Sequence, residues 1–240
     1  MRVAVNSISG IRPSGDLHLG NYIGSILPAL KYGANVLIAE YHAPGGDAFK
    51  LKHDLERYFD KDKIKMQRDT FNAGLYFALL NQTPTGLLNH MPQYKEKDKN
   101  ALMFTYPVLM AHDIAGYDYV IVGEDQRPHI EFAKDILYKV GEKCPEPIYE
   151  GGKVMDLRHP ERKMSKSNPE SCLFLCDSID DMTRKVMKAN TNEAGRKNLE
   201  FIYQSLHDKN LKFNTTPESN EKLKLEIIEI LKEQLYELNK

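Results

Sequence analysis

Apolar residues in the first half of the chain follow two patterns, and the first is a set of short runs. These runs are rich in β-branched residues and occupy positions 2–8, 35–41, 63–67 and 118–123. Runs of this length and composition predict buried β-strands. The first run leads into Ser9 and Gly10, where we expect the strand to end in a turn.

The second pattern is a set of longer segments with apolar residues at helical spacing. We expect helices over residues 18–33, 47–58, 69–82, 101–117 and 124–141. Pro28 should kink or shorten the helix that contains it, and Pro107 is expected to lie near a break in its own helix. Asp69 or Thr70 is the expected N-cap of the third helix, and Gly141 is the expected stop of the last.

The alternation of strands and helices predicts an α/β fold with a doubly wound parallel sheet. In such sheets, ligands bind beyond the carboxyl ends of the strands. Three loops are expected there, "SGIRPSGDLHLGN", "YHAPGGD" and "GEDQ", and all are rich in glycine and polar residues. The sequence therefore places its candidate chemistry where this architecture binds a nucleotide.

The pattern changes after Leu175, where the chain becomes polar and helical with no strand signal. The last helix carries its apolar residues on one face, namely Leu223, Ile227, Ile230 and Leu231. We therefore expect a domain boundary near Asp177, with a large domain over 1–177 and a small helical region over 178–240.

The composition indicates the cellular compartment of the protein, but it does not indicate its binding partner. The chain has 240 residues, 28% of them charged, and a formal net charge of −1, so net charge does not argue for a nucleic-acid partner. Its 3 cysteines form no disulfide framework, which favours a reducing compartment. Cys172 and Cys176 lack partners at metal-ligand spacing, so we expect buried thiols and no metal site. No apolar stretch resembles a signal peptide or a membrane span, which predicts a cytoplasmic protein.

Two short segments carry the candidate chemistry. In "PSGDLHLGNYIG" a glycine-rich loop enters a helix, which favours phosphate binding through backbone N–H groups. Gly20 would let a flat ring approach the backbone, and His18 and Asn21 could donate hydrogen bonds. The alternative is an ordinary strand–helix turn with an incidental histidine. The segment matches neither the Walker loop nor the G-x-G-x-x-G dinucleotide motif.

The second segment is "KMSKS", with lysines at Lys163 and Lys166. Taken alone, it is typical of a solvated surface turn. If the two lysines meet a triphosphate bound at the first loop, they would stabilise the charge on the leaving pyrophosphate. Each contact of that kind is worth about 3 kcal/mol in the transition state.

Together, "HLGN" and "KMSKS" resemble the two signatures of class I aminoacyl-tRNA synthetases. More narrowly, "SGIRPSGDLHLGNYIG", "TYPVLMAHDI", "VGEDQRPHIEFAKDI" and "KMSKSNP" resemble, in the same order, motifs of bacterial-type tryptophanyl-tRNA synthetases. The resemblance implies a Rossmann-like catalytic domain, a shortened anticodon-binding-like helical region, and a homodimer. It implies that ATP with Mg²⁺ activates L-tryptophan to an adenylate, which is then transferred to tRNA(Trp).

The resemblance also implies roles for individual residues. Those implied for catalysis are Lys163, Lys166, His18 and Asn21. The implied ATP-binding residues are Arg12, Pro13, Ser14, Gly20 and Asn21, then Gly123, Glu124 and Asp125 on the ribose side, Val154 at adenine, and Lys163, Met164, Ser165, Lys166 and Ser167 at pyrophosphate. The implied amino-acid-binding residues are Asp113, which accepts the indole N–H, Tyr106 and Gln126, which steer the charged groups, and Met110 and His42, which line the pocket. No metal ligand is implied.

Asp113 also stands out on physical grounds, because it lies in the apolar segment "PVLMAHDIAGY". A carboxylate buried there is unfavourable without a partner, and a ligand N–H would supply one. The alternative is an aspartate paired with a nearby arginine or capping a turn.

The chain departs from the family pattern at three points. Arg12 stands where glutamine is usual, and Ile8 stands where phenylalanine is common. No tyrosine lies near Ile8, which argues against the tyrosyl branch. The region after "KMSKS" is short, and its last helix has more Glu than Lys, so any phosphate contacts to tRNA are expected from the basic residues Arg184, Lys185, Lys188, Arg196 and Lys197.

Activation of the amino acid is therefore better supported than transfer to tRNA. The first alternative is a related enzyme that forms the adenylate but transfers the acyl group to another acceptor. The second alternative is a non-catalytic binding protein. The expected surface for homodimerisation is the apolar helix over residues 71–81.

Overall fold

The computed structural model describes residues 6–91, 100–207 and 217–236, and it divides the chain into two compact units. The first unit comprises Met1–Gly15 and Pro28–Glu150, and the second comprises Asp16–Leu27 and Gly151–Lys240. The change of composition at Asp177 lies inside the second unit. The compact units therefore do not have the same boundaries as the predicted domains, 1–177 and 178–240. The division into these two domains stays a prediction.

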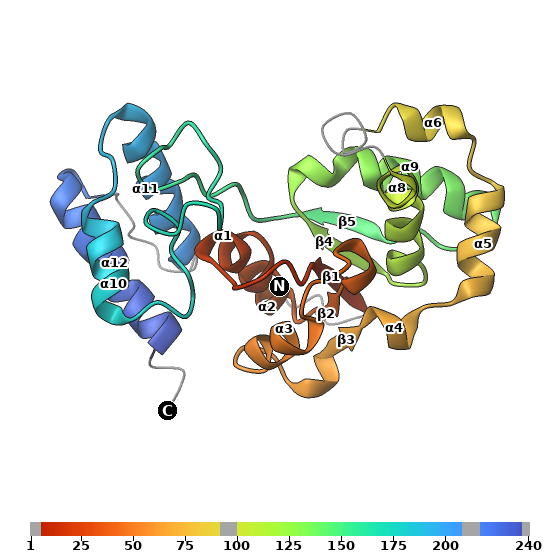
Figure 1. Ribbon diagram of the computed structural model, residues 1–240, viewed down its shortest axis with the longest axis horizontal. Helices are drawn as coiled ribbons and strands as arrows, with labels where there is room; N and C mark the ends of the chain where they lie inside the picture. Colours follow the sequence, from red (N-terminus) through yellow and green to blue (C-terminus); the bar gives the residue numbers. More distant parts are fainter. Residues whose placement is uncertain (1–5, 92–99, 208–216, 237–240) are drawn as a thin grey trace. The chain divides into compact units, whose positions relative to one another are not determined.

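The first unit is built on a five-stranded parallel sheet, shown in Figure 1. Its strands are β1 (Ser7–Ile11), β2 (Asn35–Ile38), β3 (Ile64–Met66), β4 (Tyr119–Val122) and β5 (Glu146–Tyr149). They lie in the order β3-β2-β1-β4-β5, and every neighbouring pair is parallel. This order places the carboxyl ends of all five strands at one edge, and it confirms the predicted Rossmann-like α/β fold.

Two strands differ from the prediction. β1 includes Ser9 and Gly10, so the expected turn there is wrong; residues 2–5 of the predicted strand lie outside the described residues. β5 was not predicted, because its sequence Glu-Pro-Ile-Tyr lacks a β-branched run. Among the strands of the described residues it pairs only with β4, and an edge strand tolerates Pro147, which has no N–H to give to a ladder.

The helices of the first unit connect the strands. They are α2 (Leu27–Tyr32), α3 (Ala48–Leu55), α4 (Gln67–Thr70), α5 (Ala73–Asn81), α6 (Thr85–Asn89), α8 (Ala101–Ile114) and α9 (Arg127–Lys139), with 3-10 turns at η2 (Glu40–His42), η3 (Lys61–Lys63) and η4 (Glu124–Gln126). Asn72 caps α5 by accepting a hydrogen bond from Leu75 N–H, so the expected caps Asp69 and Thr70 instead belong to the separate short helix α4.

The two prolines affect their helices differently. Before Pro28 the helix adopts a π turn, η1 (Tyr22–Ile26), in which Leu27 N–H reaches back to Tyr22 O. A π turn shifts the hydrogen-bond register at the point where the missing N–H would otherwise leave a gap. α8 instead continues through Pro107, so the break expected there is wrong.

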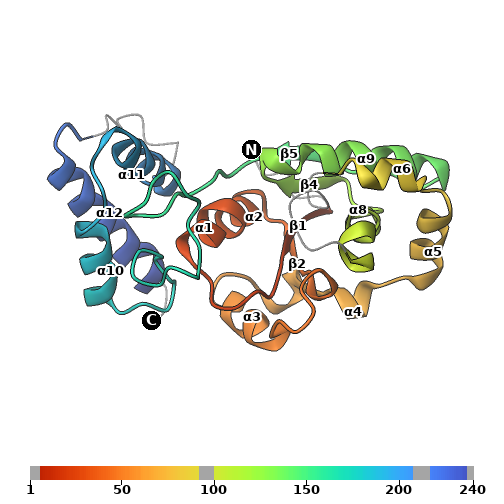
Figure 2. The same cartoon turned by 45° about the horizontal axis from the view of Figure 1, so that its top comes forward.

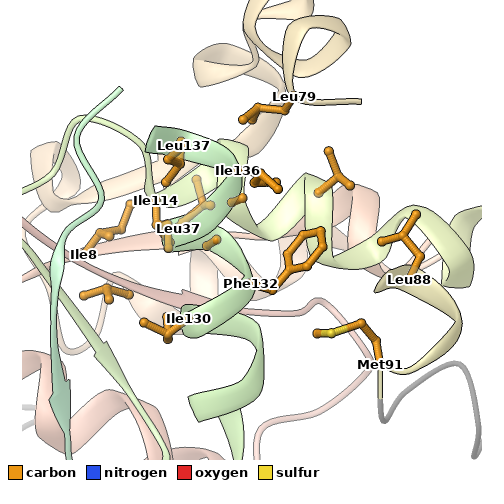
Figure 3. Packing of buried hydrophobic residues seen from close by; sticks show 14 residues of the cluster. Ile8, Leu37, Leu79, Leu88, Met91, Ile114, Ile130, Phe132, Ile136 and Leu137 are labelled. Carbon is orange, nitrogen blue, oxygen red and sulfur yellow. The ribbon is translucent and has the colours of Figure 1, made fainter. Parts of the chain in front are cut away.

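The core of the first unit lies among α8, α9 and the sheet. Figure 3 shows α9 contributing Ile130, Phe132, Ile136 and Leu137 to this cluster, opposite Ile8 and Leu37 from the strands. Leu79 of α5 joins the same core, so this helix is anchored by one of its apolar residues. The packed core fixes the strand ends and the face of α8 that carries candidate site residues.

The second unit begins with α1 (Leu19–Asn21) and η1, and it contains three longer helices, α10 (Ile179–Met187), α11 (Glu193–Leu206) and α12 (Asn220–Tyr236). Figures 1 and 2 show these three helices side by side. α12 buries Leu223, Ile227, Ile228 and Leu231; Ile228 was not expected on this face, and Ile230 is only partly buried. Buried Lys224 donates to Met187 O and Ala189 O, which ties α12 to the end of α10.

The three cysteines lie in different surroundings. Cys172 is buried, Cys144 is partly buried and Cys176 is exposed, so the expectation of buried thiols fails for Cys176. Burial raises the pKa of the Cys172 thiol to about 12.

Candidate active site

The "HLGN" segment of the second unit forms a capped helix start. His18 Nδ1 accepts a hydrogen bond from Gly20 N–H at 3.0 Å, and Asn21 Oδ1 accepts one from His18 N–H at 3.1 Å. A Cβ at position 20 would lie 2.8 Å from His18 Cε1 and 3.9 Å from Val154 Cβ. The glycine is therefore required by the imidazole that folds over it, and Val154 lies beside the same loop.

His18 carries a neutral ring with a defined tautomer. Burial, together with the positive charges of Lys166 and Lys163, lowers the pKa of His18 to about 4. Because Nδ1 accepts from a backbone N–H, the single proton of the neutral ring resides on Nε2. His18 therefore offers one N–H donor to a ligand. Asn21 uses its carboxamide oxygen within the chain, so its NH₂ group is what it offers.

The chain brings "HLGN" and "KMSKS" into one compact unit although they are far apart in sequence. Leu19 N–H donates to Leu173 O at 2.8 Å, and Leu175 N–H donates to Leu17 O at 2.9 Å. These two bonds flank an antiparallel bridge between His18 and Phe174. The segment that follows "KMSKS" is thus paired directly with the start of "HLGN", and the charges of both lysines act on His18.

The "KMSKS" loop is anchored rather than simply solvated. Lys163 forms an antiparallel bridge with Met155, and Met164 N–H donates to Val154 O at 3.0 Å. The Met164 side chain is buried, whereas Lys163 is exposed and Lys166 is partly exposed. Ser165 and Ser167 join their hydroxyl groups at 2.8 Å. The apolar residue fixes the loop and leaves charged groups at its surface.

The buried carboxylate of Asp156 joins the segments that precede and follow the same loop. Asp156 accepts hydrogen bonds from Ser171 Oγ at 2.6 Å and from the N–H groups of Arg158 and His159. Burial acts to raise the pKa of Asp156, but these donors outweigh it and the pKa lies below its usual value. Sequence reasoning did not single out this residue.

Asn198 of α11 holds the extended segment around Met155, which precedes the loop. Met155 N–H donates to Asn198 Oδ1, and Asn198 Nδ2 donates to Met155 O, both at 2.9 Å. The asparagine side chain therefore takes the place of a neighbouring strand. No sequence signal pointed to this residue, because its partner lies 43 positions away.

In the first unit, Asp113 is the centre of a buried polar cluster. It accepts from His42 Nε2 at 2.8 Å, from Gln67 Nε2 at 2.8 and 2.7 Å, and from His112 Nδ1 at 3.1 Å. Its side chain is 5% exposed. Among the described residues the donors to Asp113 are two histidines and a glutamine, so the arginine pairing considered as an alternative is not seen there.

The donors hold Asp113 as a carboxylate. Burial acts to raise the pKa of Asp113, but hydrogen bonds from His112, His42 and Gln67 outweigh it, and the pKa lies below its usual value. His112 Nε2 accepts from Asn72 N–H at 2.9 Å, so its proton is on Nδ1, which faces Asp113. Gln67 Oε1 accepts from Tyr41 N–H at 2.7 Å, so the amide NH₂ of Gln67 must face the carboxylate.

α8 presents three of the predicted site residues on one face. Tyr106, Met110 and Asp113 follow the helical spacing of four and three residues. The Tyr106 ring lies edge-on to the His42 ring with centroids 4.3 Å apart. Burial raises the pKa of Tyr106, the Arg12 charge acts to lower it, and Asp113 acts to raise it. Arg12 thus acts electrostatically on this cluster within the same unit.

Other residues join the site from the carboxyl ends of the strands. Gln67 directly follows β3, and η2 follows β2 and carries His42 together with Glu40. Glu40 accepts a hydrogen bond from Arg68 N–H and pairs with the Arg68 guanidinium. Sequence reasoning missed Gln67, Glu40 and His112, although Gln67 and Glu40 follow the carboxyl ends of β3 and β2, where this fold binds ligands.

The predicted nucleotide loops of the first unit are ordered by local contacts. Ser14 N–H donates to Arg12 O at 2.9 Å, and a Cβ on Gly46 would clash with Pro13 O. A Cβ on Gly123 would lie 2.7 Å from Asp125 Oδ1, so this carboxylate folds over the glycine.

η4 carries two further predicted site residues. Glu124 pairs with Arg127, and Gln126 N–H donates to Gly123 O at 2.9 Å. Arg12, Asp125 and Glu124 are exposed.

The basic residues expected to meet tRNA are mostly engaged within the second unit. Lys185 is 5% exposed and donates to Asp177 Oδ2 at 2.7 Å and Cys172 O at 2.9 Å. Arg196 donates to Glu200, Asn220 and the carbonyls of Pro217 and Glu218. Arg184 and Lys197 form ion pairs with Asp181 and Glu193. Lys188 is exposed. These five residues were predicted to form one phosphate-binding cluster. The prediction is wrong for Lys185, because its side chain is buried.

Within residues 6–91, 100–207 and 217–236, no three His, Cys, Asp or Glu side chains gather as a metal site would require. Among the helices of the same ranges, none is long and apolar enough to cross a membrane.

Comparison with known proteins identifies the family. The model of the tRNA synthetases class I (W and Y) matches residues 2–237. The chain belongs to this family. As a class I tRNA synthetase it is an aminoacyl-tRNA ligase, and the resemblance carried by "HLGN" and "KMSKS" is confirmed.

Relatives of this synthetase are named for tryptophan. The tryptophan–tRNA ligase of Caldanaerobacter subterraneus subsp. tengcongensis is 34% identical over 227 residues, covering 80% of this chain and 69% of that protein. The tryptophan–tRNA ligase of Helicobacter pylori is 33% identical over 254 residues, covering 89% of this chain and 77% of that protein.

Solved structures agree with the fold of this synthetase. Tryptophanyl-tRNA synthetase from Mycoplasma pneumoniae matches with a TM-score of 0.79 and 26% identity, covering 98% of this chain and 86% of that one. The Campylobacter jejuni enzyme, complexed with ADP and tryptophan, matches with a TM-score of 0.69 and 27% identity, covering 99% and 87%. Tyrosyl-tRNA synthetase from Aeropyrum pernix, at 23% identity and a TM-score of 0.74 over 99% and 85% of the two chains, shares the fold alone.

Proposed function

We propose that this synthetase activates L-tryptophan with ATP and transfers the aminoacyl group to tRNA(Trp). In the first step a carboxylate oxygen of the amino acid attacks the α-phosphorus of ATP. The bond from that phosphorus to the bridging oxygen breaks, and pyrophosphate leaves with the electron pair. In the second step a terminal ribose hydroxyl of the tRNA attacks the acyl carbon, and AMP leaves.

The observation that carries the proposal is the meeting of His18 with the "KMSKS" lysines in one unit. Lys166 and Lys163 contribute to the low pKa of His18, so three groups suited to an anion share one region. A triphosphate there would receive an N–H from His18 Nε2 and two positive charges. Positive groups that meet the leaving pyrophosphate lower the barrier only if the contact strengthens in the transition state.

The remaining nucleotide contacts stay proposals carried by the family motifs. We assign the α-phosphate loop to Arg12, Pro13, Ser14, Gly20 and Asn21, the ribose to Gly123, Glu124 and Asp125, adenine to Val154, and the pyrophosphate loop to Met164, Ser165 and Ser167 with its two lysines. Glu124 is paired with Arg127, so a ribose contact by Glu124 would have to compete with that pair.

The first unit supplies the features suited to the amino acid. The side chain of tryptophan would lie at the face of α8 that bears Tyr106, Met110 and Asp113, with His42 beside it. We assign the ammonium and carboxylate groups to Tyr106 and Gln126. The relatives named for tryptophan support this choice over tyrosine.

Magnesium is part of the proposal only as a companion of ATP. Hard cations of this kind are often held mainly by substrate phosphates and water. Among the described residues no acidic or histidine cluster is suited to hold the ion. We therefore assign Mg²⁺ no protein ligand and derive no step through it.

Two assays test the proposal. Amino-acid-dependent exchange of pyrophosphate into ATP, measured for all twenty amino acids, reports the first step. Charging of a tRNA(Trp) transcript reports the second. We expect exchange with tryptophan followed by charging. Exchange without charging would favour a related enzyme with another acyl acceptor, and no exchange with any amino acid would contradict the proposal.

A further inference from the structure

Lys185 of α10 uses its hydrogen-bond donors within the second unit. Its ammonium group has three N–H bonds, and three acceptors surround it, namely Asp177 Oδ2 at 2.7 Å, Asp177 Oδ1 at 2.9 Å and Cys172 O at 2.9 Å. The ammonium nitrogen also lies 5.1 Å from the centroid of the Phe174 ring. Because its donors are occupied and its side chain is 5% exposed, Lys185 is not placed to bind a phosphate of tRNA.

The partners of Lys185 belong to one tight turn, residues 172–177. Phe174 N–H donates to Asp177 Oδ2 at 2.9 Å, and Asp177 N–H donates to Phe174 O at 3.2 Å. α10 begins directly after this turn with Ser178 as its N-cap, and Lys185 reaches back to the turn from the last turn of the helix. The turn is therefore closed by its own hydrogen bonds and held a second time by Lys185.

The same turn is paired with the start of "HLGN". The backbone hydrogen bonds that Leu173 and Leu175 make to this segment flank the bridge between Phe174 and His18. Phe174 thus contacts Lys185 through its ring and pairs with His18 through its backbone. The single ring N–H that His18 offers to a ligand therefore depends for its position on a backbone that this turn holds.

Stability alone does not explain a buried ion pair such as Lys185 with Asp177. Apolar residues of similar size are often equally or more stable in such a place, because the desolvation of two charges offsets their attraction. What the pair adds is a defined geometry, since the ammonium group has to meet both carboxylate oxygens and a carbonyl at hydrogen-bond distance. Here that geometry bears on the residue that offers an N–H to the nucleotide.

We propose that Lys185 is a positioning residue for amino acid activation, which holds the turn at residues 172–177 so that Phe174 keeps His18 in place. The inference rests on the proposed function, since it takes His18 as a donor to the triphosphate. Lys185 acts indirectly, through Phe174 and His18. The proposal gives α10 a role in the first step of the reaction, apart from any contact with tRNA.

Two variants remove the tie between α10 and the turn. Lys185→Met keeps the length of the side chain but removes all three donors. Lys185→Met/Asp177→Asn removes both charges of the pair and keeps a side-chain oxygen for Phe174 N–H, so it leaves no buried charge without its partner. Lys222→Met, which breaks an exposed ion pair with Glu226 on α12, is the matched control.

Pyrophosphate exchange measures the effect of these variants on the first step. In both Lys185 variants we expect kcat to fall by about tenfold to a hundredfold, because a small displacement of a group that meets the reacting phosphates slows the reaction strongly. The KM for tryptophan should stay within about twofold, since the residues assigned to the amino acid lie in the first unit. Lys222→Met should behave as the wild type. An unchanged kcat in the double variant overturns the inference.

The ring resonances of His18 report its surroundings independently of activity. With ¹⁵N-labelled histidine rings, and assignment by the signals lost in His18→Asn, wild-type His18 should carry its proton on Nε2 and titrate with a pKa of about 4. In the double variant we expect a mixture of tautomers and a pKa that moves toward 6.5. Because this variant loses both charges of the pair, such a shift is not the direct effect of a lost cation.

Each remaining outcome decides the question. Unchanged kcat and unchanged His18 resonances, with a lower midpoint of urea unfolding, would make the pair purely structural and overturn the inference. A fall in kcat with unchanged His18 resonances contradicts the path through His18. A double variant that does not fold shows that the pair is needed for folding itself, which also overturns the inference. A wild type without pyrophosphate exchange contradicts the proposed function, while the His18 resonances still decide whether Lys185 positions His18.

Discussion

Asn198 and Met155 exchange two hydrogen bonds, one in each direction and both at 2.9 Å. The pair joins α11 to Met155, which forms an isolated antiparallel bridge with Lys163 at the start of "KMSKS". The helical part of the second unit therefore bears directly on the position of the "KMSKS" loop. It does so through one side chain that replaces a strand neighbour.

Asn198→Ala should loosen the "KMSKS" loop. It leaves the N–H and C=O of Met155 without their partners, which is expected to lower the free energy of unfolding by about 1–3 kcal/mol. The rate of pyrophosphate exchange should fall by about tenfold, with a smaller change in the KM for the amino acid. Lys197→Ala, next to it in an exposed ion pair, is the control and should change little. Equal effects of the two substitutions would contradict this role.

Lys163→Ala and Lys166→Ala should each lower the rate of activation by roughly two to three orders of magnitude. The KM for the amino acid should change less, because the lysines act on the leaving pyrophosphate. Arg162→Ala provides a matched control, since Arg162 is an adjacent exposed cation with a side chain 69% exposed. Pre-steady-state measurement of adenylate formation checks the prediction. Near-wild-type rates in both lysine variants would leave the loop as an ordinary surface turn.

The low pKa of His18 predicts a pH-dependent stability. Burial and the lysines lower this pKa from 6.5 to about 4 in the folded protein. The unfolded chain therefore takes up the proton first, so the stability is fully present above pH 6.5 and is lost as the pH falls toward 4. The slope from one such group reaches about 1.4 kcal/mol per pH unit.

His18→Asn removes the titrating ring while keeping a polar side chain at the helix start. Urea unfolding of wild type and variant at several pH values measures the difference in free energy of unfolding. This difference should vary between pH 6.5 and 4 and stay constant above pH 7. A difference that is flat throughout would show that the folded His18 has its ordinary pKa. The contribution of His129, whose pKa burial also lowers to about 4, is common to both proteins and cancels.

The apolar surface of α5 that is free for the predicted homodimer is smaller than the sequence indicated. In α5, Leu79 is buried in the core, and Leu75, Tyr76 and Leu80 pack partly against it, whereas Phe77 is 66% exposed. We expect a dimer at micromolar concentration and a monomer for Phe77→Glu, as measured by light scattering. Tyr138→Glu, which changes an 84% exposed aromatic residue on α9, is the control and should remain a dimer. A monomeric wild type would remove the dimer from the account.

Local sequence signals were sufficient to predict those helices and strands whose apolar pattern matches their burial in the fold. β4 is a buried run and was predicted, and α3 begins at its predicted polar segment with Asp47 as cap. β5 was not predicted, because a strand at the edge of a sheet needs few apolar residues. The helix at 69–82 was predicted as one element, but Asn72 begins a new helix, and its N–H is taken by His112.

The site was predictable where a motif names a residue and not where a distant partner defines it. Asp113 was named by the family motif and stood out by its apolar surroundings, but three of its four hydrogen bonds come from His42 and Gln67, which lie 71 and 46 positions away. Asn198 and Asp156 likewise act through partners that the chain brings together only on folding. Composition suggested a basic surface at Lys185, whereas the folded chain buries that lysine against Asp177.

The central claim is activation of tryptophan, and the most direct test is its selectivity in pyrophosphate exchange against phenylalanine and tyrosine. A site that hydrogen-bonds a ligand N–H rejects ligands without it, by up to about four orders of magnitude in favourable cases. We predict that kcat/KM for tryptophan exceeds that for phenylalanine and for tyrosine by at least about a hundredfold. Exchange that proceeds best with tyrosine, or with any amino acid lacking a ring N–H, would contradict the account.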